Sequence, residues 1–199
     1  YINCKTYFSF RYGTYATEEL VQVAVERGVT ALALTNTNST CDAWDFVNFC
    51  RQQKIKPVLG VEVRNGDELL YILLAANQKG FAWINEFLST YLQSEEDFPL
   101  QATEHPFFAD TWDGFAIYPL GKKEPADLFI NERIGILPSQ INKLFSTAVK
   151  EYPDQFVIRQ PVTFQNKTYY NVHRLLRAID KNVLLSKLPP EVVAGEEER

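Results

Sequence analysis

A buried strand that ends in a run of small polar side chains constrains this chain most strongly. Residues 29–40 read VTALALTNTNST. The stretch from Ala31 to Thr35 suits a buried β-strand, and the polar residues after it suit the loop at its carboxyl end. In parallel α/β folds, ligands bind at that end of the strands. The loop is therefore the first candidate site, although it carries no carboxylate, imidazole or thiol before Cys41 and Asp42.

Strand and helix patterns alternate along the rest of the chain. A strand pattern over residues 1–10 precedes a helix from Thr17 to Gly28, and a second helix begins at Asp42. Asn65 and Gly66 give the strongest hairpin signal. Later strands are expected at 58–63, 69–75, 115–118, 134–136 and 156–158, and later helices after Gly80, after Pro138 and over 170–179. This order predicts an α/β fold with a largely parallel sheet or barrel.

Composition and charge restrict the class of protein. A chain of 199 residues that is 46% apolar and 23% charged suits one globular domain. The net charge of −5 argues against a duplex-DNA-binding module, since phosphate contacts need clustered Lys and Arg. No stretch is long and apolar enough for a membrane span. Cys4, Cys41 and Cys50 form neither an even set nor a CxxC pair, and no signal peptide is visible, so a cytoplasmic location is expected.

The domain organisation is expected to be simple. Residues 1–188 are predicted to form one domain, and residues 189–199 a solvated acidic linker, because two prolines lead into a stretch with four glutamates. The chain has no methionine. We therefore expect it to start just after a removed initiator or inside a longer protein.

Few residues in the sequence are suited to catalysis. The nine glycines form neither GxGxxG nor GxxxxGK, and two histidines, His105 and His173, are too few for a histidine-rich metal cluster. Amides are poor ligands for catalytic zinc or manganese, and a protonated lysine repels a cation. The residues at the carboxyl ends of the strands are of these kinds, with one carboxylate among them: Asn3, Lys5, Asn36, Thr37 and Glu62.

Glu62 has the clearest functional interpretation of these residues. A carboxylate at the end of a buried strand is costly unless it is paired or hydrogen bonded. It therefore either serves a metal or meets a cation, and Lys5 is the expected partner; the alternative is an ordinary acid near a loop. His173 lies in an amphipathic helix, where a lone histidine is more often a packed or capping residue than a ligand. Cys4 is expected to be a buried, inert thiol.

Three segments resemble the N-terminal PHP (polymerase and histidinol phosphatase) domain of bacterial DNA polymerase III alpha subunits. Residues 3–9 read NCKTYFS where the family reads His-x-His-[ST]-x-[YF]-S. Residues 33–38 read ALTNTN in place of ALTDHG, and residues 55–62 read IKPVLGVE in place of IKPIIGCE. Residues 131–145 and 171–188 resemble alpha subunits of the Bacteroidetes type. The likeness spans essentially the whole chain.

The resemblance implies a distorted (βα)7 TIM-like barrel, incomplete if the chain is a fragment. Active PHP domains bind a trinuclear zinc or manganese cluster that hydrolyses phosphoesters, and in some polymerases the cluster supplies 3′–5′ proofreading. Carried over by position, Asn3 and Lys5 replace histidines, Asn36 replaces an aspartate and Thr37 replaces a histidine. Among these positions, only Glu62 and His173 still carry side chains of a type that binds metal ions. We interpret the site as vestigial, with no catalytic residue, cofactor or metal expected; an intact site would hold zinc or manganese.

The leading hypothesis is a noncatalytic, structural PHP domain of a DNA-directed DNA polymerase, a nucleotidyltransferase of DNA replication. The implied partners are the polymerase core further along the same chain, a proofreading exonuclease, and DNA through the parent protein. One alternative is a metal-dependent phosphoesterase or 3′–5′ exonuclease with a reduced ligand set. A second alternative is a part of an error-prone repair polymerase.

Overall fold

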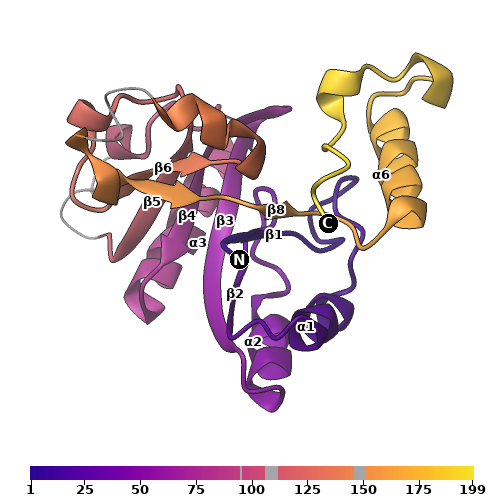
Figure 1. The fold of residues 1–199 in the computed structure, drawn as a ribbon, viewed down its shortest axis with the longest axis horizontal. Helices are drawn as coiled ribbons and strands as arrows, with labels where there is room; N and C mark the ends of the chain where they lie inside the picture. Colours follow the sequence, from indigo (N-terminus) through magenta and orange to yellow (C-terminus); the bar gives the residue numbers. More distant parts are fainter. Residues whose placement is uncertain (95, 106–111, 146–150) are drawn as a thin grey trace. The chain divides into compact units, whose positions relative to one another are not determined.

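The computed structural model describes residues 1–94, 96–105, 112–145 and 151–199, and the chain divides into two compact units. Unit 1 comprises Tyr1–Val58 and Pro161–Arg199, and unit 2 comprises Leu59–Gln160. Each unit has strands and helices of its own (Figure 1). The domain boundary expected at residue 188 stays a prediction.

Unit 1 is built on parallel strands. β1 (Asn3–Cys4) pairs in parallel with β2 (Ala31–Leu34) and with β8 (Pro161–Val162). The strand expected in the opening segment is thus confirmed. The helices of unit 1 are α1 (Thr17–Glu26) and α2 (Ala43–Gln52), which pack together, and α6 (Lys167–Asp180); short 3-10 turns follow as η5 (Leu185–Lys187) and η6 (Pro190–Val192).

The strand expected over residues 1–10 is much shorter than predicted. Only Asn3 and Cys4 are in strand β1, and the aromatic residues after them lie in turns. The backbone N–H of Ser9 donates to the Thr6 carbonyl, and those of Tyr12 and Gly13 donate to the Ser9 carbonyl. These local hydrogen bonds replace a strand ladder, because backbone groups that bond within a turn cannot also pair with a neighbouring strand.

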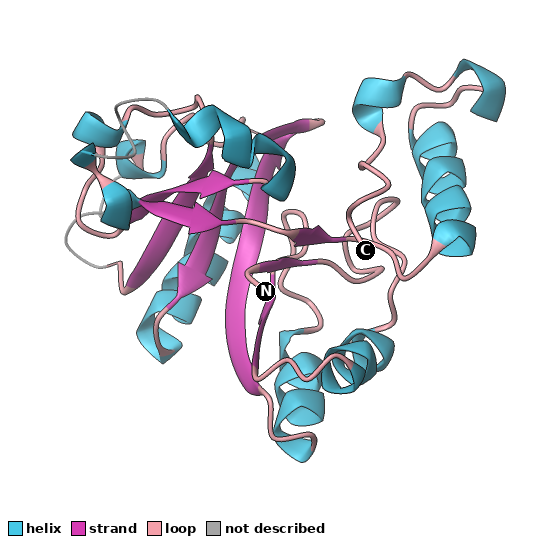
Figure 2. Ribbon diagram, viewed as in Figure 1, coloured by secondary structure: helices cyan, strands magenta, loops and turns pink. Residues whose placement is uncertain are grey.

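Unit 2 contains a mixed sheet. β3 (Lys56–Asn65) begins in unit 1 and continues as the first strand of unit 2, and it pairs antiparallel with β4 (Glu68–Ala75). The turn between them includes Gly66, whose φ of +57° suits glycine, so the predicted hairpin is confirmed. β5 (Gly114–Pro119) pairs antiparallel with β4, and β6 (Glu132–Ile136) and β7 (Phe156–Ile158) add in parallel (Figure 2).

The core of unit 2 forms where α3 (Gln78–Ser94) packs against β4. Trp83, Ile84 and Phe87 of the helix contact apolar strand residues such as Tyr71 and Tyr118 in one buried cluster. The short 3-10 turns of this unit are η1 (Ala102–Glu104), η2 (Pro125–Asp127), η3 (Pro138–Phe145) and η4 (Pro153–Gln155).

The predicted α/β class is confirmed. Hydrogen-bonded neighbours among the described strands follow the order β7-β6-β5-β4-β3-β2-β1-β8. The two pairings of β4 are antiparallel and the described pairings of β1 and β6 are parallel. The sheet is less parallel than the alternation alone suggests, because the hairpin places β4 between two antiparallel neighbours. Within the described residues, no helix is both long enough and apolar enough to cross a membrane.

Residues 189–199 make specific contacts within unit 1. Ala194 is buried, and the Glu198 carbonyl accepts hydrogen bonds from the backbone N–H groups of Thr163 and Phe164. The Thr163 hydroxyl donates to the Glu198 carboxylate at 2.6 Å. The segment is therefore ordered by packing here, and its use as a linker toward a polymerase core stays a prediction.

Candidate functional site

Asn36, at the carboxyl end of β2, is the centre of a buried hydrogen-bond network in unit 1. Its Oδ1 accepts from the Thr6 backbone N–H at 2.7 Å and from the Ser9 hydroxyl at 2.8 Å. Its Nδ2 donates to Asp42 Oδ1 at 2.7 Å and to Thr6 Oγ1 at 3.0 Å. The side chain thus acts as acceptor and donor at once, which an amide can do and an ionised carboxylate cannot. We call Thr6, Ser9, Thr17, Asn36 and Asp42 the Asn36 network.

Asp42 supplies the negative charge of this network. It stands at the N-cap position of α2, but its side chain makes no capping bond and is buried instead. Its Oδ2 accepts from the hydroxyls of Thr6 at 2.7 Å and Thr17 at 2.8 Å, and its Oδ1 accepts from the Asn36 amide. Three neutral donors therefore offset the cost of burying this carboxylate.

The loop that carries Thr6 and Ser9 is held close to the Asn36 network. Ser9 Oγ accepts from the Thr37 backbone N–H at 3.0 Å, which joins the loops after β1 and β2. Gly13 closes the first loop, since a Cβ at this position would lie 1.9 Å from the Thr6 carbonyl oxygen. Backbone and side-chain contacts together thus fix the position of the loop after β1. In this position Thr6 and Ser9 of the loop lie next to the Asn36 amide.

Asn3 and Lys5, the residues on either side of Cys4, are also buried. The Asn3 amide donates to the Thr35 hydroxyl at 3.0 Å. Lys5 is 1% exposed, and its Nζ lies 5.8 Å from the centre of the Tyr12 ring. A buried ammonium at this position repels any cation placed near it.

His173, on α6, is fully buried, and both of its ring nitrogens contact the backbone. Nε2 accepts from the Ala194 N–H at 2.9 Å, which requires the proton to sit on Nδ1. Nδ1 lies 2.6 Å from the Tyr12 carbonyl oxygen and donates to it. The sequence-based interpretation of His173 as a packed residue agrees with this geometry, and its nitrogen lone pair is engaged.

Two cations border the Tyr12 ring next to His173. The Arg177 guanidinium lies 5.2 Å from the centre of that ring, and Lys5 approaches the same ring. The Tyr12 and His173 rings meet edge to face with centres 4.8 Å apart. Two cationic side chains therefore lie near His173, and one of them, Arg177, is ion-paired with Asp180.

Glu62 lies on β3 within unit 2, and its side chain is fully buried. Its Oε1 accepts from Arg64 Nε at 2.7 Å, and Arg64 NH1 donates to the Asp67 carbonyl at 2.7 Å. Glu62 therefore meets a cation, one of the alternatives that the sequence left open, and this cation is Arg64, which the sequence analysis did not name. The expected pairing of Glu62 with Lys5 stays a prediction.

The residues at the predicted ligand positions make structural contacts within their own units. Asn36 is saturated by its network, both ring nitrogens of His173 bond the backbone, Lys5 is a buried cation, and Glu62 is ion-paired. Across the part of the chain that the structure describes, no group of three or more His, Cys, Asp or Glu side chains is placed to hold a metal ion. Asn3, Lys5, Asn36 and Thr37 carry no carboxylate or imidazole, the ligand types that a trinuclear zinc or manganese cluster takes, and the vestigial state of the site stays a prediction.

The sequence analysis missed four members of the Asn36 network. Thr6 and Ser9 were used only as motif positions and Thr17 only as a helix start, and Asp42 was noted as a helix start and as the first carboxylate after the polar loop. A signal was present in the sequence: Asp42 is the first carboxylate after the polar loop, and hydroxyl residues stand at the ends of two nearby segments. The sequence could not show that Asp42, at the start of α2, directs its side chain toward Thr6, Thr17 and Asn36.

The cysteines differ sharply in their expected reactivity. Burial raises the pKa of the Cys4 thiol to about 12 and that of the Cys50 thiol to about 11, whereas Cys41 is exposed. Because the thiolate is the reactive form, a maleimide at neutral pH should label one thiol per folded chain and three in denaturant. Mass spectrometry of the labelled peptides would check this, and rapid labelling of Cys4 in the folded chain would contradict it.

The sequence of this chain is similar to those of known proteins. The chain is 27% identical over 176 residues to the DNA polymerase III subunit alpha of Staphylococcus aureus strain COL, a match that covers 85% of this chain and 15% of that protein. It is 36% identical over 62 residues to the subunit alpha of Chlamydia muridarum, covering 31% of this chain and 5% of that protein. The chain thus spans well under a fifth of the length of these relatives.

A solved structure described as a metal-dependent phosphoesterase from Bifidobacterium adolescentis aligns with 98% of this chain and 90% of its own, at 13% identity and a TM-score of 0.40. A family model, the PHP domain, matches residues 2–117, which is more than half of the chain. The resemblance inferred from the three motif segments is therefore confirmed. The chain belongs to the PHP domain family.

Proposed function

We propose that this chain is a noncatalytic, structural PHP domain of a DNA polymerase III alpha subunit, in which the metal site of the family is vestigial. One observation carries the proposal: Asn36, at the family's aspartate position, is saturated by hydrogen bonds to Thr6, Ser9 and Asp42. Because the Asn36 amide oxygen already accepts from the Thr6 N–H and the Ser9 hydroxyl, both of its lone pairs are used and none is left for a cation.

The neighbouring ligand positions support the same proposal. The nitrogen lone pair of His173 accepts from a backbone N–H, and the carboxylate of Glu62 faces a guanidinium. His173 and Glu62, the two positions whose side chains could still bind a metal, therefore each have a partner within the protein. The former ligands now contribute to folding, since removal of either partner would leave a buried polar group unsatisfied.

The larger setting follows from the relatives. We infer that the parent is a DNA-directed DNA polymerase, that its core lies further along the same polypeptide, and that the chain meets DNA only through that parent, in the cytoplasm. Similarity to DNA polymerase III alpha subunits over most of this chain supports the inference. The same domain could also offer a surface on which a proofreading exonuclease docks. An alternative parent is a polymerase that acts in error-prone repair.

The metal content of the purified chain tests the proposal. Emission spectrometry should find zinc and manganese well below one equivalent, and a 3′-labelled single-stranded oligonucleotide should stay intact. A stoichiometric metal that is lost in Glu62→Gln but kept in Glu18→Gln, an exposed control on α1, would instead favour a phosphoesterase or exonuclease with a reduced ligand set.

A further inference from the structure

The sequence contains one Asn-Gly pair, in which Asn65 is the last residue of β3 and Gly66 opens the turn to β4. An asparagine before a glycine can lose its side-chain amide without an enzyme, because glycine has no Cβ to shield its backbone nitrogen. That nitrogen bonds to Cγ of the asparagine, and Nδ2 leaves as ammonia with the proton of the glycine N–H. Water then opens the resulting succinimide to aspartate or isoaspartate. Gly66 is exposed, so water reaches this turn.

Both polar atoms of the Asn65 side chain bond the backbone of one distant residue. Nδ2 donates to the Phe98 carbonyl at 2.9 Å, and Oδ1 accepts from the Phe98 N–H at 2.9 Å. The Gly66 nitrogen must approach the face of this amide, and Nδ2 must leave it. The side chain therefore has to turn away from Phe98 before the succinimide can close, which costs two hydrogen bonds.

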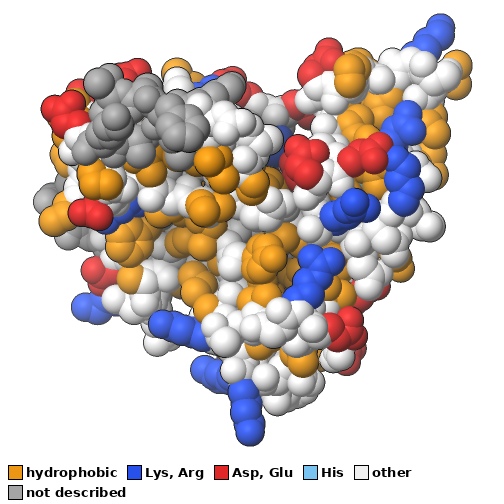
Figure 3. Space-filling view, in the orientation of Figure 1, with side chains coloured by type: hydrophobic (Ala, Val, Ile, Leu, Met, Phe, Trp, Pro, Cys, Tyr) orange, Lys and Arg blue, Asp and Glu red, His pale blue; other side chains and the backbone are white. Residues whose placement is uncertain are grey.

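A buried aromatic ring holds residues 96–105 on the core of unit 2. Hydrophobic side chains reach the surface in several places (Figure 3), but the Phe98 ring is 5% exposed. It stacks on Phe87 of α3 with ring centres 5.5 Å apart. The Tyr71 hydroxyl donates to the Pro99 carbonyl at 3.1 Å. Packing and polar contacts together thus keep Phe98 in place.

We propose that Asn65 is a deamidation site that the contact with Phe98 protects. While residues 96–105 are packed on unit 2, the Asn65 amide is held and conversion is slow. When this segment opens, the amide is released beside the Gly66 nitrogen, and conversion proceeds at the rate of an unstructured chain. The fraction of converted chains thus records how often the segment has opened. The inference concerns unit 2 alone and does not depend on the proposed polymerase context.

Conversion weakens the contact that protected the site. An aspartate at position 65 keeps an acceptor for the Phe98 N–H but has no N–H for the Phe98 carbonyl, so two oxygens would face each other. Isoaspartate adds a methylene group to the backbone where Asn65 pairs with Glu68. Because refolding does not restore the amide, residues 96–105 stay less tightly held after conversion.

Deamidation of the full chain in the folded and unfolded states tests the proposal. The chain is kept at mildly alkaline pH in buffer or in urea, and the peptide that contains Asn65 is followed by mass spectrometry. Conversion should be slower in buffer than in urea by about tenfold or more, because the reaction requires the segment to open. A synthetic peptide of residues 61–70 controls for the effect of urea on the chemistry, and its rate should be equal in both.

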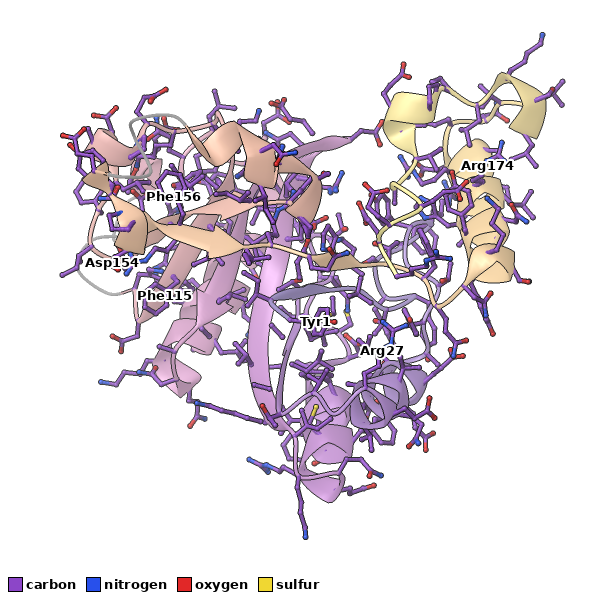
Figure 4. All side chains as sticks on the ribbon, viewed as in Figure 1. Tyr1, Arg27, Phe115, Asp154, Phe156 and Arg174 are labelled. Carbon is purple, nitrogen blue, oxygen red and sulfur yellow. The ribbon has the colours of Figure 1, made fainter. Side chains whose placement is uncertain are left out.

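Variants that loosen residues 96–105 should speed conversion in the folded chain. Tyr71→Phe removes the hydroxyl that bonds the Pro99 carbonyl, and conversion should become faster by about threefold or more. Phe98→Ala removes the buried ring and should have a larger effect. Phe115→Ala is the matched control, since this ring is 42% exposed on β5 of the same unit (Figure 4), and it should convert at the wild-type rate. Thermal unfolding identifies folded variants, and Tyr71→Phe decides if Phe98→Ala does not fold.

Hydrogen exchange tests the consequence of conversion. Asn65→Asp should speed exchange of the backbone amides in residues 96–105 by about threefold or more. Asn171→Asp, at an exposed residue of α6, adds the same charge elsewhere and should leave this exchange unchanged.

Any of three outcomes would overturn the proposal. The first is that the folded chain and the peptide convert at the same rate, or that neither converts. The second is that Tyr71→Phe and every folded form of Phe98→Ala convert at the wild-type rate. The third is that residues 96–105 exchange equally fast in Asn65→Asp and in the wild type.

Discussion

Asn36→Asp is expected to destabilise the folded chain by about 3 to 5 kcal/mol at neutral pH, the range for an uncompensated buried charge. The substitution replaces an N–H donor by an oxygen at the atom that lies 2.7 Å from Asp42 Oδ1. Two buried carboxylates would then face each other where a donor and an acceptor meet now. Urea unfolding of the two chains, followed by tryptophan fluorescence, measures the difference.

The effect of Asn36→Asp should depend on pH in one direction. Repulsion between two close carboxylates raises the pKa of the pair in the folded state above that in the unfolded state. The variant therefore loses stability relative to the wild type as the pH rises above about 4, the unfolded value for aspartate, and the loss shrinks toward that pH. One shared proton would restore the donor that the amide provides.

Asn171→Asp is the matched control, because Asn171 is exposed on α6. It adds the same charge without a buried neighbour, so its unfolding free energy should stay within about 0.5 kcal/mol of the wild type. Equal stability of Asn36→Asp and Asn171→Asp at neutral pH would contradict the arrangement of the Asn36 network. A large gain for Asn36→Asp on addition of zinc or manganese would contradict the vestigial metal site.

His173→Phe is expected to cost about 2 to 5 kcal/mol of unfolding free energy, because two buried backbone groups lose their partners. The Tyr12 carbonyl would lose a donor at 2.6 Å, and the Ala194 N–H would lose an acceptor at 2.9 Å. Phenylalanine keeps a ring of similar size, so the loss measures the hydrogen bonds more than the packing. Hydrogen exchange of the Ala194 amide should also become faster.

Two further variants separate the contributions at His173. His173→Asn keeps a donor near the Tyr12 carbonyl, and His173→Gln keeps an acceptor in reach of the Ala194 N–H, so each should lose less stability than His173→Phe. Val172→Ala, at the exposed neighbour, should change stability by no more than about 0.5 kcal/mol. If His173→Phe is as stable as the wild type and Ala194 exchange is unchanged, the structural role of His173 is wrong.

Local patterns in the sequence were sufficient for much of the fold. The apolar run from Ala31 produced β2, and Asn65 with Gly66 produced the β3–β4 hairpin. Both signals act within a few residues, through side-chain alternation and the φ preference of glycine. The family also followed from short motifs, since their order and spacing match those of the PHP domain although the residues at its ligand positions differ.

Local patterns were insufficient where polar groups compete for partners. Residues 7–10 have strand-forming side chains, yet the turn hydrogen bonds around Ser9 end β1 at Cys4. Asp42 begins a helix as predicted, yet its carboxylate bonds Thr6 and Thr17 instead of the helix N-terminus. In each case a side chain or backbone group found a partner that the local sequence did not specify.

The sequence by itself determined the α/β class and the family, whereas the replacement of metal ligands at Asn3, Lys5, Asn36 and Thr37 stays a prediction from the resemblance. The tertiary structure decided what those residues do instead. Thr6 and Asn36 are 30 positions apart, and Tyr12 and His173 are 161 apart. Contacts over such separations depend on how the whole chain folds, and each buried polar group must find its partner there. For this reason only the structure showed that α6 is anchored by its polar side and leaves its apolar side exposed.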